Sequence, residues 1–279
     1  MSDGLKTHRY RCEALAAWFG TDLGNLVLEA EKARIAAAMN QAFGVRQLEI
    51  GLCGDLSVTP PQQEWHRMLA VPVWDRSLGR CEDVGPLVCR PEELPFGDDA
   101  LDAVVLHHTL DLAEYPHSAL RESARVVRPG GCLVVVGFNP IGFWGMRRLF
   151  STRRRMPWNA RFMLCRRVHD WLSLLNFAVS TSRYGFLRPP TYNRRLLSRL
   201  EFMEPLASVG TQVPLGAFYC VSAFKEEKGM IGLRPEWATR KVVPIPVGGR
   251  STTMPGLNGR SRPARRHRHR SEEEGSNNE

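Results

Sequence analysis

Residues 92–140 read EELPFGDDALDAVVLHHTLDLAEYPHSALRESARVVRPGGCLVVVGFNP, and this stretch decides the fold. It contains two short apolar runs rich in β-branched residues, Ala103–Leu106 and Cys132–Val136, which are typical of buried strands. Between them lies a helical segment near Ser118–Val127, followed by an Arg-Pro-Gly-Gly stop. Two buried strands joined by a helix form a right-handed βαβ unit. The stretch therefore predicts a doubly wound, mostly parallel α/β sheet.

The sequence before this stretch predicts a helix followed by the first strand. Apolar residues recur at helical spacing over Leu23–Phe43, with Asp22 placed to cap that helix and Gly44 to end it. Gln47–Leu52 then has the length and composition of a short buried strand. A Pro-Pro pair within residues 55–67 argues against a long helix there, because proline lacks the N–H that a helix interior needs.

The remaining elements are predicted from shorter patterns. In chain order these are strands at Met68–Trp74 and Pro86–Cys89, helices after about Gly142 and at Arg166–Leu175, a strand at Ala178–Phe186, a helix at Asn193–Met203 and a strand at Leu215–Lys225. From Glu226 the sequence is dominated by Pro, Gly, Arg, Ser and Asn, so we expect residues 226–279 to be a disordered, basic tail.

Composition limits the class of protein. The chain has 279 residues, of which 43% are apolar, enough to build the core of a folded domain. No run of about eighteen apolar residues exists, and the N-terminus lacks the unbroken apolar stretch of a signal peptide. Seven cysteines occur without a Cys-x-x-Cys pair, which favours buried thiols over disulfides or a zinc site. We therefore expect a cytoplasmic protein without a metal centre.

Positive charge is concentrated in one segment. The formal net charge is +9, and residues 141–200 hold thirteen Arg against a single acid, Asp170, a local balance of +12. Residues 141–177 interleave Arg with aromatic side chains, which predicts a helical cover rich in both. Together with the basic tail, this surface can bind an anionic partner such as nucleic acid or a phosphate-bearing molecule, or stack on a planar small molecule. It can equally be a solvated helix face packed through its aromatic side chains.

The motifs of residues 92–140 resemble those of a known enzyme family. LPF at residues 94–96, a strand opened by Asp102, then His108, then a helix closed by Pro-Gly-Gly, follow one another as in class I S-adenosylmethionine (SAM) dependent methyltransferases of the type 11 domain group. The resemblance covers this stretch without a gap. It implies a Rossmann-like, seven-stranded sheet whose last strand is antiparallel. It also implies SAM as the cofactor and methyl transfer to an unidentified acceptor, with a small molecule favoured over a macromolecule.

The resemblance assigns the turn after the first strand to the cofactor. Glu49 and Gly51 match the acid and the first glycine of the family's motif. Cys53 and Asp55 stand where its second and third glycines belong, and Gly54 is displaced by one position. Glycines at such a turn let the backbone approach the ligand closely, so Glu49, Gly51 and Gly54 are predicted to contact the cofactor.

Two further loops are assigned to the cofactor in the same way. Asp75, twenty-one residues after Gly54, is expected to accept hydrogen bonds from the ribose, unless it is a solvated turn residue. Arg90 and Pro91 resemble the loop beside the adenine, where Arg90 replaces the family's acid. Arginine has no acceptor atom, so its side chain would have to stack on the adenine instead.

The loop after the fourth strand would lie beside the transferred methyl group. His107 is predicted to contact the cofactor, and His108 aligns with a histidine frequent in the family. Because imidazole exchanges protons near neutral pH, His108 is the candidate catalytic base. The alternative is structural, with His108 hydrogen-bonded to a neighbouring loop carbonyl while Leu110 packs inward.

Two functions remain open on the sequence. The first is a SAM-dependent methyltransferase, with an N-terminal helical segment at residues 1–45, a methyltransferase-like domain at residues 46–225 and the tail at residues 226–279. The second is a catalytically idle protein of the same fold that serves as a binding or regulatory module through its Arg-rich region.

Overall fold

A computed structural model describes residues 2–61, 65–72, 84–151, 155–200 and 214–227. Within these residues, seven strands form one sheet in the order β3-β2-β1-β4-β5-β7-β6. The first five strands run parallel, and β7 lies antiparallel between β5 and β6. The doubly wound, mostly parallel sheet predicted from the sequence is thereby confirmed, including its antiparallel last strand.

In the described chain, two helices come before the first four strands, and helices and strands then alternate singly or in pairs. The strands are β1 Arg46–Ile50, β2 His66–Val71, β3 Gly85–Val88, β4 Leu101–His107, β5 Val127–Phe138, β6 Phe177–Gly185 and β7 Phe218–Lys225. The helices are α1 Ser2–Phe19, α2 Asp22–Met39, α3 Thr109–Leu112, α4 Pro116–Val126, α5 Phe143–Phe150, α6 Cys165–Leu174 and α7 Arg194–Arg199.

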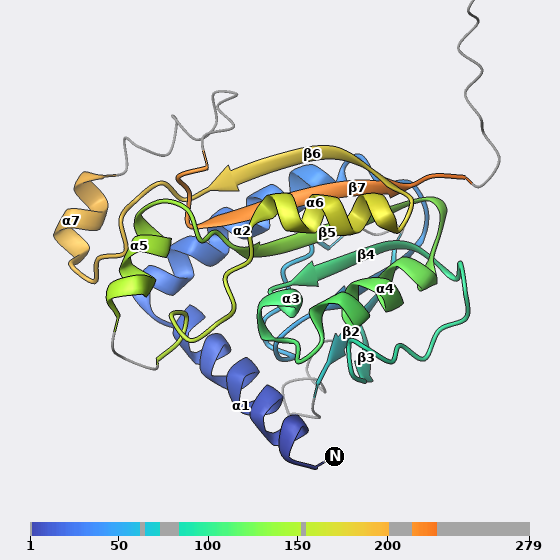
Figure 1. Ribbon diagram of the computed structural model, residues 1–279, viewed down its shortest axis with the longest axis horizontal. Coiled ribbons are helices and arrows are strands. Elements are labelled where there is room, and N and C mark those ends of the chain that lie inside the picture. Colours follow the sequence, from blue (N-terminus) through green and yellow to red (C-terminus); the bar gives the residue numbers. More distant parts are fainter. Residues whose placement is uncertain (1, 62–64, 73–83, 152–154, 201–213, 228–279) are drawn as a thin grey trace, which may run out of the picture. The chain divides into compact units, whose positions relative to one another are not determined.

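Residues of β4 alternate between the two faces of the sheet. Ala103 and Val105 pack into the core that α1 and α2 cover, whereas Val104 and Leu106 pack into the core beneath α4 and α6. Figure 1 shows α2 behind the sheet, with α4 and α6 in front of it. Because both faces are buried, the strand is apolar at all four positions, which is the pattern that the sequence displayed.

The Pro-Gly-Gly turn lies inside β5 and not at the end of the preceding helix. Helix α4 ends at Val126, and Val127 is already extended and pairs with Leu101. The next pair joins Ala103 to Cys132, so residues 128–131 bulge out of the sheet. Gly130 takes the left-handed conformation that this bulge requires, with φ +76°. The prediction that the glycines close the helix is therefore wrong, because strand pairing resumes before them.

The N-terminal end of α2 is also set by a different residue than predicted. Thr21, and not Asp22, caps the helix, because the Thr21 hydroxyl accepts a hydrogen bond from the Gly24 amide at 3.2 Å. The helix ends at Met39, four residues before the predicted boundary, with Asn40 as its last cap. These differences move no buried residue of α2 to another face.

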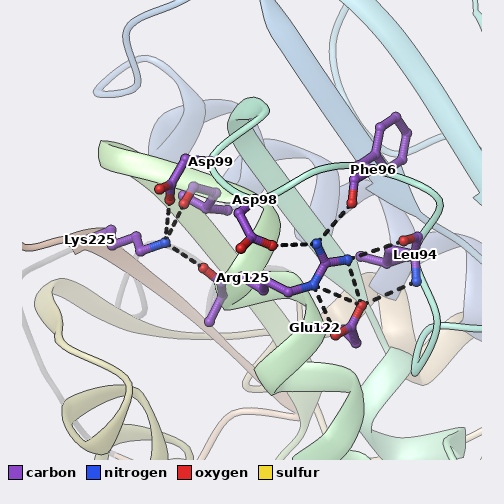
Figure 2. Close-up of polar contacts among 9 residues, drawn as sticks. Leu94, Phe96, Asp98, Asp99, Glu122, Arg125 and Lys225 are labelled. Carbon is purple, nitrogen blue, oxygen red and sulfur yellow. Dashed lines mark hydrogen bonds and ion pairs between the residues drawn. The ribbon is translucent and has the colours of Figure 1, made fainter.

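Arg125 ties α4 to the loop that precedes β4 (Figure 2). Its guanidinium pairs with Glu122 at 2.8 Å and with Asp98 at 2.7 Å. It also donates to the carbonyls of Leu94 at 3.2 Å and Phe96 at 2.9 Å. One side chain thus holds the Leu-Pro-Phe loop against α4. Both lie within residues 92–140, so this contact links two parts of the stretch that decides the fold.

Lys225, at the end of β7, binds the same region from the other side (Figure 2). Its ammonium group pairs with Asp99 at 2.7 Å and donates to the carbonyls of Ala124 at 2.9 Å and Val127 at 2.6 Å. We refer to the charged residues at this end of β4 as the amino-end cluster, which consists of Asp98, Asp99, Glu122, Arg125 and Lys225.

Several expectations concern parts of the chain outside the described residues. Asp75 lies there, as does the predicted tail beyond Glu227. The six cysteines within the described residues are free thiols, as predicted. None of the described helices combines the length and the apolar content that crossing a bilayer requires.

Candidate active site

The carboxyl ends of β1–β4 meet around a small cavity. Residues that line it are Gly51 after β1, Pro72 after β2, Pro91 after β3, Thr109 after β4, and His8 and Cys12 of α1. Its volume is about 10 Å³, the space of roughly one water molecule. In open α/β sheets, ligands bind outside the carboxyl ends of the strands, which makes this edge the candidate active site.

Glu49 and Gly51 build the turn at the end of β1. The Glu49 carboxylate is buried and accepts hydrogen bonds from the Ser57 hydroxyl at 2.9 Å and from the amides of Val58 and Thr59 at 2.9 Å and 3.1 Å. Those contacts hold the loop after β1 against the strand. At Gly51, an added Cβ would stand 3.1 Å from the Leu69 side chain, so the glycine lets the turn lie close to β2.

The other residues assigned to the cofactor differ in burial and in whether they line the cavity. Gly54 is buried in the loop after β1, and Pro91 is buried and lines the cavity. Arg90 is half-buried and pairs through its backbone with Glu93, whose amide donates to the Arg90 carbonyl at 3.1 Å. The structure thus brings Gly51 and Pro91 to one cavity, and the cofactor roles of all of them stay predictions.

Four buried side chains form a hydrogen-bonded network at the carboxyl end of β4, which we name the histidine cluster: Glu31, His107, His108 and Asp111. The two oxygens of Glu31 accept hydrogen bonds from Nε2 of His107 and from Nε2 of His108, each at 3.0 Å. Nδ1 of His108 lies 2.8 Å from Oδ2 of Asp111. None of the four residues is more than 1% exposed.

The hydrogen bonds of His108 determine its protonation. Ionised carboxylates only accept, so when both partners are ionised each ring nitrogen of His108 donates and the imidazole carries a positive charge. Burial alone would lower the pKa of His108, but the Glu31 carboxylate and the hydrogen bond to Asp111 raise it to about 9. Burial likewise would raise the pKa of Glu31, yet the two histidines hold it below its ordinary value. Burial raises the pKa of Asp111.

The histidine cluster also fixes the backbone where β4 ends. His108 has φ +52°, a left-handed conformation that histidine adopts more readily than most residues. Its ring stacks on Phe138 at 4.0 Å between centroids, and the Phe138 amide donates to Asp111 at 2.9 Å. The cluster therefore joins α2 to the ends of β4 and β5. His107 and His108 were predicted as cofactor and catalytic residues, and both belong to this network.

Within the described residues, Glu31, His107 and His108 are the group that could hold a metal ion, with ligand atoms within 4.8 Å of one another. In this structure the same atoms hydrogen-bond to each other. A doubly protonated His108 has no lone pair to offer a metal, so the geometry is that of an ion-pair network.

Sequence reasoning missed Glu31. The residue lies four positions after Val27 and four before Ile35, and all three are fully buried on one side of α2. A lone charge within an apolar helical stripe was therefore the available signal. Its partners are 76 and 77 residues away in the chain, and no local pattern links them.

The Arg-rich cover packs through its aromatic side chains. Trp144 and Trp158 are buried, and the guanidinium of Arg147 lies 5.7 Å from the centre of the Trp158 ring. Arg148 lies 4.9 Å from the ring centre of Phe162. These aromatic residues therefore belong to the core of the cover, while much of the positive charge is exposed.

Residues 48–135 match the family model of a methyltransferase domain. The match begins in β1 and ends in β5, so it contains all four strand ends that surround the cavity. Over these residues the chain is similar to the methyltransferase domain family. The resemblance inferred from residues 92–140 is thereby confirmed and extended upstream to the turn at Gly51.

Curated relatives match the methyltransferase domain over parts of their length. An uncharacterised Escherichia coli protein, YafS, is 44% identical over 110 residues, which cover 39% of this chain and 46% of that protein. A demethylmenaquinone methyltransferase of Mycobacterium tuberculosis is 52% identical over 46 residues, or 16% of this chain and 20% of the enzyme. The chain thus spans less than half the length of these relatives.

A solved structure supports the same fold across most of the chain. It is a Thermotoga maritima protein described as a SAM-dependent methyltransferase, possibly a histamine N-methyltransferase. The TM-score is 0.59 at 20% sequence identity, and the alignment covers 79% of this chain and 99% of that protein. The fold around the methyltransferase domain is therefore the class I methyltransferase fold.

Proposed function

We propose that the protein is a methyltransferase that takes its methyl group from SAM at the carboxyl edge of β1–β4. The observation that carries this proposal is that the family match and the cavity fall on the same strand ends. In open α/β sheets this edge is the ligand-binding edge. A small-molecule acceptor is part of the proposal, and its identity is open.

The turn after β1 suits a ligand that approaches the backbone, because Gly51 carries no side chain. Gly51, Pro91 and Thr109 are the residues that would hold the cofactor. A cavity of about 10 Å³ is far smaller than a nucleoside, so the wall made by α1 must open for binding. His8 fastens that wall through a 3.2 Å hydrogen bond between its Nδ1 and the Leu112 carbonyl.

SAM, when bound, supplies a methyl group on a sulfonium, which a nucleophile can displace in one step. The protein then mainly has to position the acceptor and exclude water. Thr109 contributes by donating a hydrogen bond to the Ile50 carbonyl at 3.0 Å, which fixes the end of β4 against the end of β1. This contact keeps the two loops that flank the cavity in one arrangement.

His108 acts in this proposal as a positioning residue. Its two ring nitrogens are engaged by Glu31 and Asp111, and a pKa of about 9 keeps the ring protonated at neutral pH. A protonated imidazole cannot accept the proton of an acceptor molecule. If the acceptor must lose a proton, another group has to take it. The sequence-based assignment of His108 as the base is the alternative to this positioning role, and a pH profile of activity distinguishes the two.

Calorimetric titration with SAM and with S-adenosylhomocysteine tests the proposal. Both ligands are expected to bind the full-length protein. Gly51→Val, which adds a side chain at the turn, is expected to abolish binding. Gly97→Val is the matched control, because an added Cβ at Gly97 meets no atom within 4 Å. Circular dichroism spectra of both variants report whether the fold is kept.

Absence of binding by the unaltered protein at millimolar ligand would overturn the enzyme proposal and favour the idle module, which the family match does not favour. A cytoplasmic location and an anionic partner for the tail stay predictions.

A further inference from the structure

A second, larger cavity lies between the C-terminal end of α1, helix α5 and residues 155–158. Its volume is about 600 Å³, within the range of small-molecule sites. Figure 1 shows α5 at the same side of the molecule as the start of α2, just after α1 ends. The residues that matter for its chemistry are Trp18, Arg147, Phe150, Arg155, Trp158 and Tyr192.

The aromatic residues give this cavity a fixed floor and an open rim. Trp18 is 6% exposed and Trp158 is 8% exposed, and both pack against the fully buried Trp144, at ring-centre distances of 6.0 Å and 5.5 Å. At the rim, Phe150 is 81% exposed and Tyr192 is 56% exposed. The small exposed parts of the packed indoles and the two exposed rim rings give the cavity an aromatic lining, which favours an aromatic, planar ligand.

The charged residues of this cavity are both positive. Arg147 and Arg155 line it, and none of the described lining residues is acidic. Among the described residues, neither arginine forms an ion pair with a carboxylate. The guanidinium of Arg147 lies 5.7 Å from the Trp158 ring centre, next to the aromatic floor. Guanidinium groups in such a setting bind carboxylate, sulfonate or phosphate groups through paired hydrogen bonds.

A chain of rings connects this cavity to the proposed site of methyl transfer. Trp18 lies 6.0 Å from Phe138, and Phe138 stacks on His108 at 4.0 Å, where β4 ends. Cys12, which lines the small cavity, and Trp18, which lines the large one, are both on α1. Six residues of helix separate them, a rise of about 9 Å. The two cavities therefore share α1 as a wall.

We propose that the larger cavity binds a small, planar, anionic molecule and that this molecule is the methyl acceptor. The acceptor role rests on the proposed function, whereas the binding of an aromatic anion does not. The cavity has the dimensions for one aromatic molecule, and the arginines at its edge select a negative group on that molecule. A single half-open hollow of this size favours a small molecule over a strand of nucleic acid.

Two matched fluorescent probes test the binding step without SAM. 8-Anilinonaphthalene-1-sulfonate carries a flat naphthalene ring and a sulfonate, and N-phenyl-1-naphthylamine has the same rings without the sulfonate. The unaltered protein is expected to bind the sulfonate at least about tenfold more tightly, because a paired guanidinium–anion contact adds a charge-assisted bond. The double variant Arg147→Gln/Arg155→Gln is expected to lose that preference and to keep its affinity for the neutral probe.

Arg166→Gln is the control, since Arg166 is an exposed arginine on α6 outside the cavity. Equal binding of both probes by the unaltered protein, or an equal loss in Arg166→Gln, would overturn the proposal. So would a double variant that loses affinity for a single-stranded oligonucleotide while its preference for the sulfonate is unchanged. SAM titration of the double variant separates the two ideas. A double variant that binds SAM as before but has lost its preference for the sulfonate supports both ideas. Unaltered protein that binds the sulfonate but not SAM keeps the anion site and removes the acceptor role.

Discussion

The two ends of β4 carry two polar clusters that differ in their exposure to water. In the amino-end cluster, the side chains of Asp98 and Asp99 are 75% and 51% exposed, and Arg125 is 33% exposed. In the histidine cluster, the side chains of Glu31 and His108 are 0% exposed. Water and salt screen the charges of the amino-end cluster. The charges of the histidine cluster are shielded from solvent and are balanced by one another.

This difference teaches which end of the strand is costly to change. Exposed ion pairs exchange protein contacts for water contacts at little net gain, so each contributes little. Removing one partner of a buried pair lowers the free energy of unfolding far more, because the remaining charge is neither paired nor hydrated. Substitutions in the histidine cluster, at the carboxyl end of β4 beside the candidate active site, should therefore destabilise the fold most. Substitutions in the amino-end cluster should have smaller effects.

Glu31→Ala is expected to have the largest effect on stability. It removes the carboxylate partner of His107 and leaves the buried His108 with Asp111 as its remaining carboxylate, which should lower the free energy of unfolding by about 3–5 kcal/mol. Glu29→Ala is the control, since Glu29 is on the same helix with its side chain 61% exposed and pairs with the surface residue Lys32. Urea unfolding followed by circular dichroism measures both variants. Similarly small losses of unfolding free energy in Glu31→Ala and Glu29→Ala would contradict the idea that the buried cluster contributes more than exposed ion pairs.

The contribution of the histidine cluster to the free energy of unfolding should fall as pH rises from about 6.5 to about 9. The pKa of His108 is raised to about 9 in the folded protein, so its contribution is complete below the unfolded value of about 6.5. It is lost as pH rises through 9, by on the order of 3 kcal/mol. His108→Asn, which tolerates the left-handed backbone, should flatten this part of the pH profile. A profile that the substitution leaves unchanged would contradict the assignment.

Arg125→Met should lower the free energy of unfolding by about 1–2 kcal/mol, because it removes two ion pairs and two hydrogen bonds to carbonyls. Arg121→Met, an exposed position on the same helix, is the control and should change stability little. Thermal unfolding of both variants provides the measurement. A loss as large as that of Glu31→Ala would mean that the two ends of β4 are alike.

Asp98→Asn should have the smallest effect, about 0.2–1 kcal/mol, since this partner of Arg125 is 75% exposed. Adding 1 M salt (a Debye length of about 3 Å) should make the variant and the unaltered protein equally stable. A difference that survives in high salt would show that the pair is shielded from solvent.

The sequence predicts the sheet because its signals are local. Val104, Val105 and their neighbours are apolar on both faces, and that run alone indicates a buried parallel strand. The bulge at Gly130 could not be predicted, because the helix stop and the strand bulge use the same residues. Which one forms depends on the pairing of Val127 with Leu101.

The candidate site is predicted less completely, because its decisive contacts join distant parts of the chain. The assignment of His108 to the end of β4 follows from sequence, but its protonation depends on Glu31, which no spacing rule links to it. Glu49 matches a motif position, yet its oxygens are used by the loop at Val58 and Thr59. A motif identifies a residue type and a place, whereas hydrogen-bond partners decide what the residue does.

The distance along the chain between Glu31 and its partners has a consequence for synthesis of the protein. Glu31 is made 76 residues before His107. At ordinary translation rates of 5–20 residues per second, that interval lasts roughly 4–15 s. Until β4 has left the ribosome, packing of α2 would bury the Glu31 carboxylate without a counter-charge. The Glu31 side of α2 therefore stays exposed to solvent during that interval. Helix α2 is therefore made before β4 but reaches its native position only once β4 is available.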